Sequence, residues 1–141
     1  PAVDVARRFA DVPVFKIDEP MVERAVSMAS KIGVLGTTKA SLNSVSEFIR
    51  AKAQERGTKV DVEPAFCEGA FEALTGGNRE LHDESVIKAA LALARSVDVL
   101  VLAQASMSHL EQRIADVTRR EVLTSLKEIV PALKEFLLEA P

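Results

Sequence analysis

Aromatic residues are scarce in this sequence of 141 residues, because they make up 4%, all of them phenylalanine, with no tryptophan or tyrosine. Positive charge is also in short supply, since 18 lysine and arginine residues stand against 21 aspartate and glutamate residues, a formal net charge of −3. Proteins that bind nucleic acid usually need a basic surface for phosphates and aromatic rings for base stacking. We therefore expect no nucleic acid among the partners.

Long apolar runs are missing as well. The longest, residues 97–103, is interrupted by Asp98, whereas a helix needs about 20 apolar residues to cross a bilayer. The single cysteine, Cys67, cannot form a disulfide within the chain, and no charged start followed by an apolar stretch suggests export. We expect no membrane association, and a soluble protein of the cytoplasm.

Hydrophobic residues make up 48% of the sequence, enough for one compact domain over residues 1–141. Short runs rich in valine, isoleucine and leucine alternate with longer helical patterns, which is typical of parallel βαβ units. We predict an α/β fold with a parallel sheet of about four to five strands and helices on both faces. The expected strands are residues 12–17, 31–35, 58–63, 97–103 and 121–123.

Five segments have apolar residues at spacings of three and four, which predicts helices. These segments are residues 19–30, 41–56, 79–95, 106–119 and 123–138. Gly57 follows the second segment as a natural C′ residue, and Asn78 precedes the third as a possible cap. Pro131 lies inside the last segment, where its missing N–H predicts a kink or a break.

Two strand-to-helix junctions carry the polar groups that a binding site needs. In parallel sheets ligands bind beyond the carboxyl ends of the strands, where hydroxyls and free backbone N–H groups attract anions. The first junction lacks the Gly-Lys-Ser/Thr of a Walker loop and the G-x-G-x-x-G of a dinucleotide site. Each junction alone is also consistent with an ordinary helix cap. The candidate residues are Thr37, Thr38 and Ser41 at the first junction, and Gln104, Ala105 and Ser106 at the second.

Together, the two junctions resemble the aspartate/glutamate racemase family, part of the Asp/Glu/hydantoin racemase superfamily. Members have a glycine- and threonine-rich segment after one strand, here residues 36–41, and later a Leu-Ala-Cys-Thr-like turn, here residues 102–107. The segments 15–21, 68–74 and 77–83 add to the likeness, which extends from Val12 to about Ser125.

This resemblance implies two similar α/β lobes with the active site between them, and racemisation without pyridoxal phosphate or metal. Family enzymes move the Cα proton of aspartate, glutamate or a related small carboxylic acid with a cysteine thiolate on each side of the carbon. Backbone N–H groups and hydroxyls hold the carboxylates and stabilise the developing charge. By position, the six candidate residues would bind the substrate.

The chain departs from the family pattern at both cysteines. Gln104 stands at the second cysteine position and has no proton to exchange near neutral pH. The first cysteine belongs to a motif that should precede Pro1, so we assign no catalytic residue and expect an incomplete chain, mainly the second lobe. Residues 1–18 and 123–141 would belong to, or pack on, the missing first lobe. A homodimer or association with that lobe would cover the apolar residues near the C-terminus.

Other interpretations stay open at this stage. A non-catalytic carboxylate-binding or regulatory domain of the same fold needs no thiol. A decarboxylase of the superfamily is disfavoured because its cysteine would stand at Gln104, and a receiver domain is disfavoured because no acidic pair ends an early strand.

Three further residues carry side chains that often take part in chemistry. We interpret Cys67 as a buried structural residue, because reactive cysteines need an exposed, electropositive setting. No zinc-like spacing surrounds the two histidines. We therefore interpret His82 as a solvated helix start rather than a metal ligand, and His109 as a possible edge of the pocket.

Overall fold

Four strands form one all-parallel sheet at the centre of the structure, a computed structural model that describes residues 2–139. The order across the sheet is β2-β1-β3-β4, which confirms the predicted α/β class. The strands are β1 (Lys31–Gly36), β2 (Asp61–Phe66), β3 (Val99–Leu102) and β4 (Glu121–Thr124).

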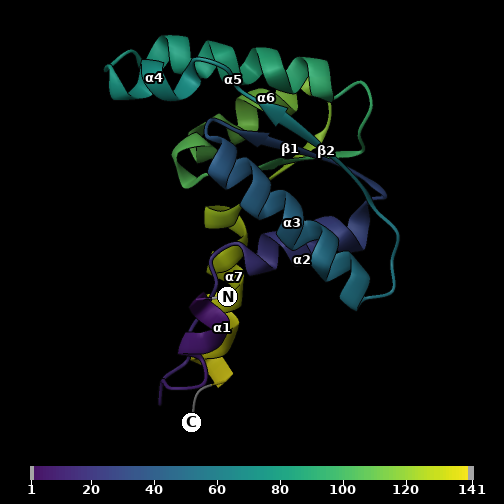
Figure 1. The fold of residues 1–141 in the computed structure, drawn as a ribbon, viewed down its shortest axis with the longest axis vertical. Helices are drawn as coiled ribbons and strands as arrows, with labels where there is room; N and C mark the ends of the chain where they lie inside the picture. The colour runs from purple at the N-terminus through teal and green to yellow at the C-terminus, as the bar shows by residue number, and fades with distance from the viewer. Residues whose placement is uncertain (1, 140–141) are drawn as a thin grey trace.

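Helices cover both faces of this sheet (Figure 1). On one face lie α2 (Glu19–Met28) and α3 (Lys39–Glu55). The other face carries α4 (Ala70–Thr75), α5 (Arg79–Leu93), the 3-10 helix η1 (Ala105–Leu110) and α6 (Glu111–Thr118). Two further helices, α1 (Ala2–Ala6) and α7 (Ser125–Glu139), lie side by side and project from this body as an arm.

β3 is apolar at every position because both of its faces are buried. In β3, Val99 and Val101 pack with α2 and α3, whereas Leu100 and Leu102 pack with α5 and η1. All four side chains are 0–1% exposed. Adding a charge to either face of β3 would therefore place it in one of the two cores.

Residues 12–17 do not form a strand, contrary to our prediction. They connect α1 to α2 mostly without regular secondary structure, and Val12 is 68% exposed. The ring of Phe15 packs edge-to-face on Phe136 of α7, with the ring centroids 5.2 Å apart. The apolar residues of this segment therefore pack on the arm or face solvent instead of joining the sheet.

Most other predicted elements are confirmed, with shifted ends. Gly57 has a φ of 64° after α3, and the Asn78 side chain accepts a hydrogen bond from the Leu81 N–H at 3.1 Å. The segment 106–119 divides into η1 and α6, and α4 was not predicted. The expected break at Pro131 is absent, since α7 continues through it. Pro131 is exposed, so the carbonyl group that loses its partner can be solvated.

The arm is attached to the body by polar and ring contacts. Arg24 of α2 pairs with Glu128 of α7 at 2.8 Å, and Arg7 pairs with Glu19 at 2.7 Å. Lys16 lies over the ring of Phe48 in α3, 3.2 Å from its centroid. Our prediction for residues 1–18 and 123–141 includes Pro1 and residues 140–141, which lie outside the described residues.

Candidate functional site

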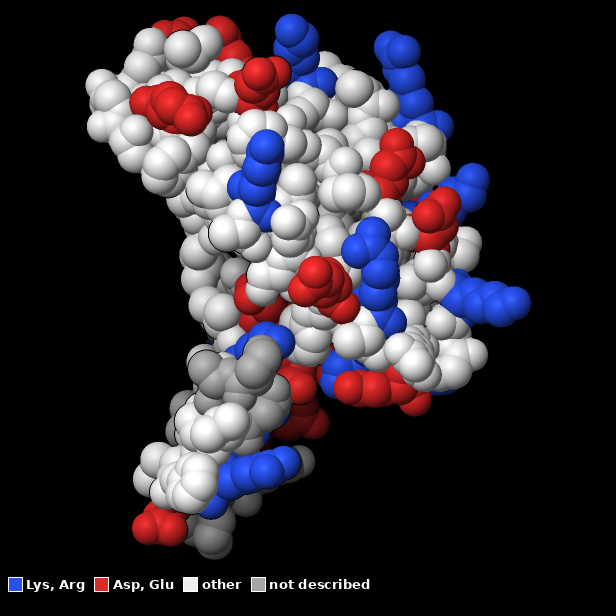
Figure 2. Space-filling view, in the orientation of Figure 1, with Lys and Arg blue, Asp and Glu red and all other residues white. Residues whose placement is uncertain are grey.

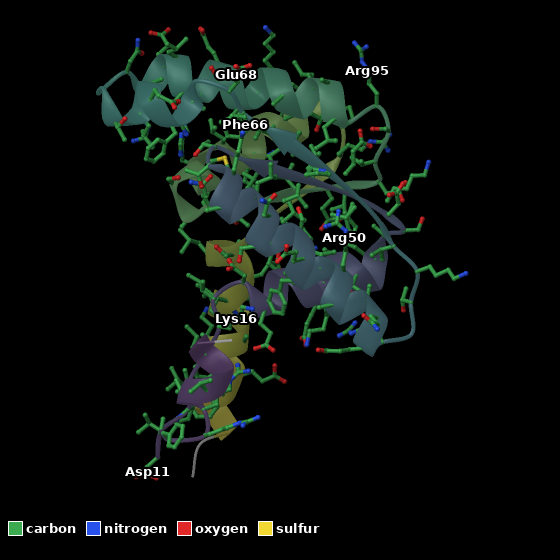
Figure 3. The ribbon with its side chains drawn as sticks, in the orientation of Figure 1. Asp11, Lys16, Arg50, Phe66, Glu68 and Arg95 are labelled. Carbon is green, nitrogen blue, oxygen red and sulfur yellow. The ribbon has the colours of Figure 1, made fainter. Side chains whose placement is uncertain are left out.

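The two junctions singled out in the sequence lie at the topological switch point of the sheet. From β1 the chain passes through α3 to β2 on one side, and from β3 it passes through η1 and α6 to β4 on the other. Doubly wound sheets bind their ligands where the strand order reverses in this way. Figure 3 shows the strand direction, with Phe66 at the end of β2 on the left and Arg95, which precedes β3, on the right.

A pair of hydrogen bonds joins the two junctions directly. The side-chain oxygen of Gln104 accepts from the N–H of Thr37 at 2.7 Å and from its hydroxyl at 2.9 Å. Because a backbone N–H can only donate, the amide oxygen faces Thr37 and the amide nitrogen faces away. Thr37 is 2% exposed. The Thr37 side chain therefore connects the two loops and is not itself open to a ligand.

Thr38 and Ser41 satisfy one another at the start of α3. Their hydroxyls are 2.7 Å apart, and the N–H of Ser41 donates to the Thr38 hydroxyl at 3.3 Å. The Ser41 hydroxyl also donates to the Thr38 carbonyl at 3.1 Å. Both residues are partly exposed. They therefore form a helix cap, and any contact with a ligand would add to that arrangement.

Unengaged donors lie on the other side of Gln104. Within residues 2–139 the Gln104 amide nitrogen has no hydrogen-bond partner, and the N–H groups of Ala105 and Ser106 have no acceptor. Ala105 and Ser106 are exposed, and Gln104 is partly exposed. This arrangement can hold a small anion such as a carboxylate.

Gly36 fixes how closely the first junction approaches α3. A Cβ atom at Gly36 would lie 2.9 Å from the Cβ of Leu42 and 3.2 Å from its Cα. Contacts under about 3 Å do not occur without movement of one partner. The absence of a side chain at Gly36 therefore sets the position of Thr37 and Thr38.

The other two strands also end at this edge with buried residues. Cys67 follows β2, is 1% exposed, and donates its backbone N–H to the Gly36 carbonyl at 2.9 Å. Burial raises the pKa of its thiol to about 11, so the thiolate is scarce at neutral pH, in agreement with a structural role. Thr124 at the end of β4 donates its hydroxyl to Glu111 at 3.2 Å, and Ser125 beside it is also buried. Thr124 and Ser125 were not among the residues predicted for the site. Two hydroxyl residues at the end of a strand are nevertheless the signal that pointed to Thr37 and Thr38.

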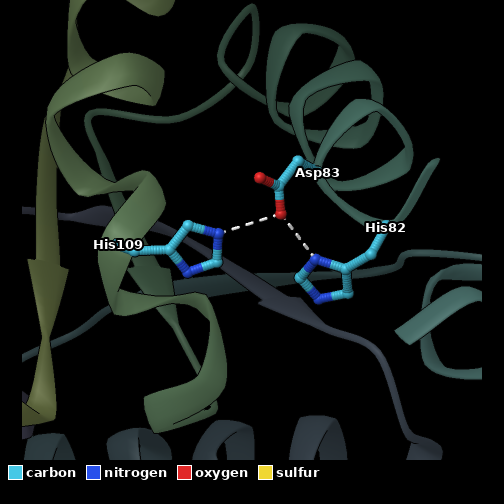
Figure 4. Close-up of side chains that lie close together, drawn as sticks. All are labelled: His82, Asp83 and His109. Carbon is cyan, nitrogen blue, oxygen red and sulfur yellow. Dashed lines mark hydrogen bonds and ion pairs between the residues drawn. The ribbon is translucent and has the colours of Figure 1, made fainter. Parts of the chain in front are cut away.

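The histidines are arranged differently from our prediction. His82 is 0% exposed, so its interpretation as a solvated helix start was wrong. It contacts Asp83, its neighbour on α5, and Asp83 in turn contacts His109 of η1 (Figure 4). The fold thus brings together residues whose spacing in sequence gave no such indication.

Two hollows of the surface lie away from the junctions. One of about 380 Å³ is lined by α5 and Arg113 of α6, and another of the same volume lies between α2 and α3. Figure 2 shows a concave outline between the body and the arm, on the side toward which the strands point. Acidic and basic side chains are interspersed over this face. No helix within residues 2–139 combines the length and the apolar character needed to span a bilayer.

The fold and the position of this edge define a doubly wound α/β unit with its candidate ligand site at the switch point. The model of the Asp/Glu/hydantoin racemase family matches residues 1–133, and the chain belongs to that family. No curated protein matches the sequence.

Solved structures of racemases share the fold. Glutamate racemase isoform RacE1 from Bacillus anthracis matches with a TM-score of 0.72 and 19% identity, over 96% of this chain and 52% of its own. Allantoin racemase from Klebsiella pneumoniae matches with a TM-score of 0.69 and 20% identity, over 98% of this chain and 56% of its own. Allantoin racemase from Pseudomonas fluorescens matches with a TM-score of 0.62 and 18% identity, over 91% of this chain and 54% of its own. The chain thus spans about half the length of each.

Proposed function

We propose that this chain is the substrate-binding half of a cofactor-independent racemase that acts on aspartate, glutamate or a related small carboxylic acid. The main support is the pair of hydrogen bonds from Thr37 to Gln104, which joins the β1 and β3 junctions at the switch point. Family membership supports a racemase-type reaction, and the names of the similar structures include both glutamate and allantoin racemases.

In this proposal the chain holds the substrate and does not supply the base. The Gln104 amide nitrogen and the N–H groups of Ala105 and Ser106 would bind a carboxylate, with Thr38 and Ser41 lining the same edge. Fixed donors of this kind stabilise the negative charge that develops when a Cα proton leaves. Cys67 is an unsuitable base, because its thiol is buried and its raised pKa keeps it protonated.

The partner in this proposal is a second lobe that docks beside the arm. The chain corresponds to about half of each racemase that it matches. Leu137 and Leu138 in α7 are 70% and 87% exposed, and Phe9 beside α1 is 83% exposed. Burial of such residues by the other lobe would stabilise both. A homodimer built on the same surface is the competing outcome. We also propose that the protein acts in amino-acid metabolism in the cytoplasm.

Hydrogen exchange at Cα tests the function. The complete natural protein that carries this chain would be incubated in D₂O with each enantiomer of aspartate, glutamate and allantoin, and the Cα signal followed by proton NMR. We expect loss of that signal for aspartate or glutamate, and slower loss in Gln104→Leu. Binding of these compounds without any exchange would favour a non-catalytic domain and contradict the proposal.

A further inference from the structure

Two histidines and an aspartate converge where α5 meets η1. The same carboxylate oxygen, Oδ1 of Asp83, lies 2.8 Å from Nδ1 of His82 and 2.9 Å from Nε2 of His109 (Figure 4). The three possible ligand atoms all lie within 4.8 Å of one another. None of these three residues belongs to the six candidate substrate-binding positions.

Each ring nitrogen of His109 faces an oxygen atom. Its Nε2 faces the Asp83 carboxylate, and its Nδ1 lies 3.0 Å from the carbonyl oxygen of Ser106. The Ser106 carbonyl and an ionised Asp83 carboxylate are both acceptors with no hydrogen to donate. A neutral imidazole has a single N–H and can donate to only one of them. If that N–H is on Nδ1 and donates to Ser106, the lone pair of Nε2 points at a carboxylate. A second proton or a metal ion must lie between them.

Metal-binding histidines have the arrangement seen at His109. The ring nitrogen that does not bind the metal usually donates to a backbone carbonyl or a carboxylate, which fixes the tautomer. Ser106 provides that carbonyl. The rings of His82 and His109 are nearly parallel, with centroids 6.1 Å apart.

His82 adds a second observation. Its side chain is 0% exposed, and its Nε2 has no hydrogen-bond partner among the described residues. The buried side chain is held in one orientation, so only one ring nitrogen can take part in the cluster. That nitrogen, Nδ1, is the one that points at Asp83.

Asp83 supplies the third donor of the cluster. Its side chain is only partly exposed, and its Oδ1 lies between the two imidazole nitrogens.

We propose that His82, Asp83 and His109 bind a divalent transition-metal ion of the zinc and cobalt class. Two imidazoles and one carboxylate are a donor set that these ions accept. Bonds of about 2.0–2.1 Å to each ligand would separate the ligand atoms by roughly 3.3 Å in a tetrahedral site. Small rotations of the three side chains would open the present contacts to that spacing, and the fourth position would take water.

Such an ion would connect α5 to η1, the segment that carries Ala105 and Ser106. It would act on the position of these residues and would not be a reactant. The proposal does not depend on the racemase function, because it concerns residues outside the candidate substrate site.

Cobalt binding tests this site directly. The chain, prepared without a histidine tag and treated with chelator, would be titrated with Co²⁺ and followed by its visible d–d absorption, with Zn²⁺ competition and calorimetry for stoichiometry. We expect one equivalent to bind, with absorption typical of four-coordinate cobalt. In Asp83→Asn and His109→Gln the affinity should fall more than about tenfold, since even outer-shell partners of a metal site contribute about 10–100-fold.

Glu84→Gln is the matched control, because it removes one negative charge from the exposed neighbour of Asp83 on the same helix. Its affinity should equal that of the wild type, and circular dichroism would verify that all variants are folded. No saturable binding of Co²⁺ or Zn²⁺ near one equivalent would overturn the proposal and leave the three side chains as a hydrogen-bonded cluster. Binding that is unchanged in folded Asp83→Asn would overturn it as well.

Discussion

Gln104 acts within this chain as a fixed acceptor for the buried donors of Thr37. The resemblance noted in the sequence implies a cysteine at this position, and a thiol is a much weaker acceptor than an amide oxygen. In this chain the glutamine joins two loops. Its outward amide nitrogen remains available as a donor at the same edge.

Replacing Gln104 should separate the effects of shape and of hydrogen bonding. In Gln104→Leu, the Thr37 N–H and hydroxyl lose their acceptor while they stay buried, which should lower the free energy of unfolding by about 1–3 kcal/mol. Gln104→Glu retains an acceptor oxygen and should lie close to the wild type at pH 7. Urea denaturation followed by circular dichroism measures the free energy of unfolding of both variants. Equal stability of the leucine variant and the wild type would show that the observed hydrogen bonds contribute little.

Cys67 should make stability depend on alkaline pH. Its pKa is raised from 9.0 to about 11 in the folded protein, mainly by burial. Above pH 9 the unfolded chain loses the thiol proton while the folded chain keeps it, so stability should fall as pH rises through this window. The slope from this group approaches about 1.4 kcal/mol per pH unit. Denaturation of the wild type and Cys67→Ala at several pH values would measure it, and the variant should lack this part of the slope. Identical slopes would contradict the assignment.

At the scale of elements, the turn from β1 into α3 is the tightest part of the candidate site. Gly36 lies against the first turns of α3, and Thr38 caps that helix. The close approach allows α3 to present Thr38 and Ser41 at the carboxyl edge. A change here should therefore affect both folding and the site.

Gly36→Ala tests this close approach. The added methyl group would lie 2.9 Å from Leu42 Cβ and 3.2 Å from its Cα, so α3 must shift, which should reduce stability by about 1–3 kcal/mol. Thermal unfolding would show it as a lower Tm. Gly57→Ala is a useful comparison because its added methyl meets nothing within 4 Å and its effect comes from the positive φ alone. A Gly36→Ala variant as stable as the wild type would mean that the junction is loosely packed.

Local pattern predicted most of the elements but little of the site. The buried strands and long helices are visible in sequence because their apolar spacing reflects which faces are covered. Residues 12–17 have a strand-like composition, yet they have no place beside a neighbouring strand and pack near the arm. The Thr37–Gln104 bonds join residues 67 positions apart, and the His82–His109 approach depends on how α5 meets η1. Contacts of this kind depend on tertiary packing and leave no periodic signal.

At the scale of the whole molecule, the arm carries several exposed, large apolar side chains. Val130 and Leu126 are about half exposed on α7, and Leu137 and Leu138 near its end are exposed further. Contiguous apolar surface of this kind usually marks an interface. The proposed occupant is the other lobe of a two-lobed protein.

Isolated chains should therefore associate through the arm. Light scattering after size exclusion should show species larger than a monomer that increase with protein concentration. The double variant Leu137→Lys and Leu138→Glu should shift the population toward monomer, because it places charges in the interface, whereas Lys134→Gln on the same helix should not. A wild-type chain that stays monomeric at every concentration tested would contradict an unsatisfied interface on α7.

The central claim is that a small carboxylate binds where the β1 and β3 junctions meet. Titration of the ¹⁵N-labelled chain with aspartate, glutamate and succinate, followed by amide NMR, tests it most directly. The account predicts saturable shifts of the Gln104 side-chain amide and of the Ala105 and Ser106 amides, with reduced affinity in Gln104→Leu. Saturable shifts confined to residues away from these two junctions, or no shifts at all, would contradict it.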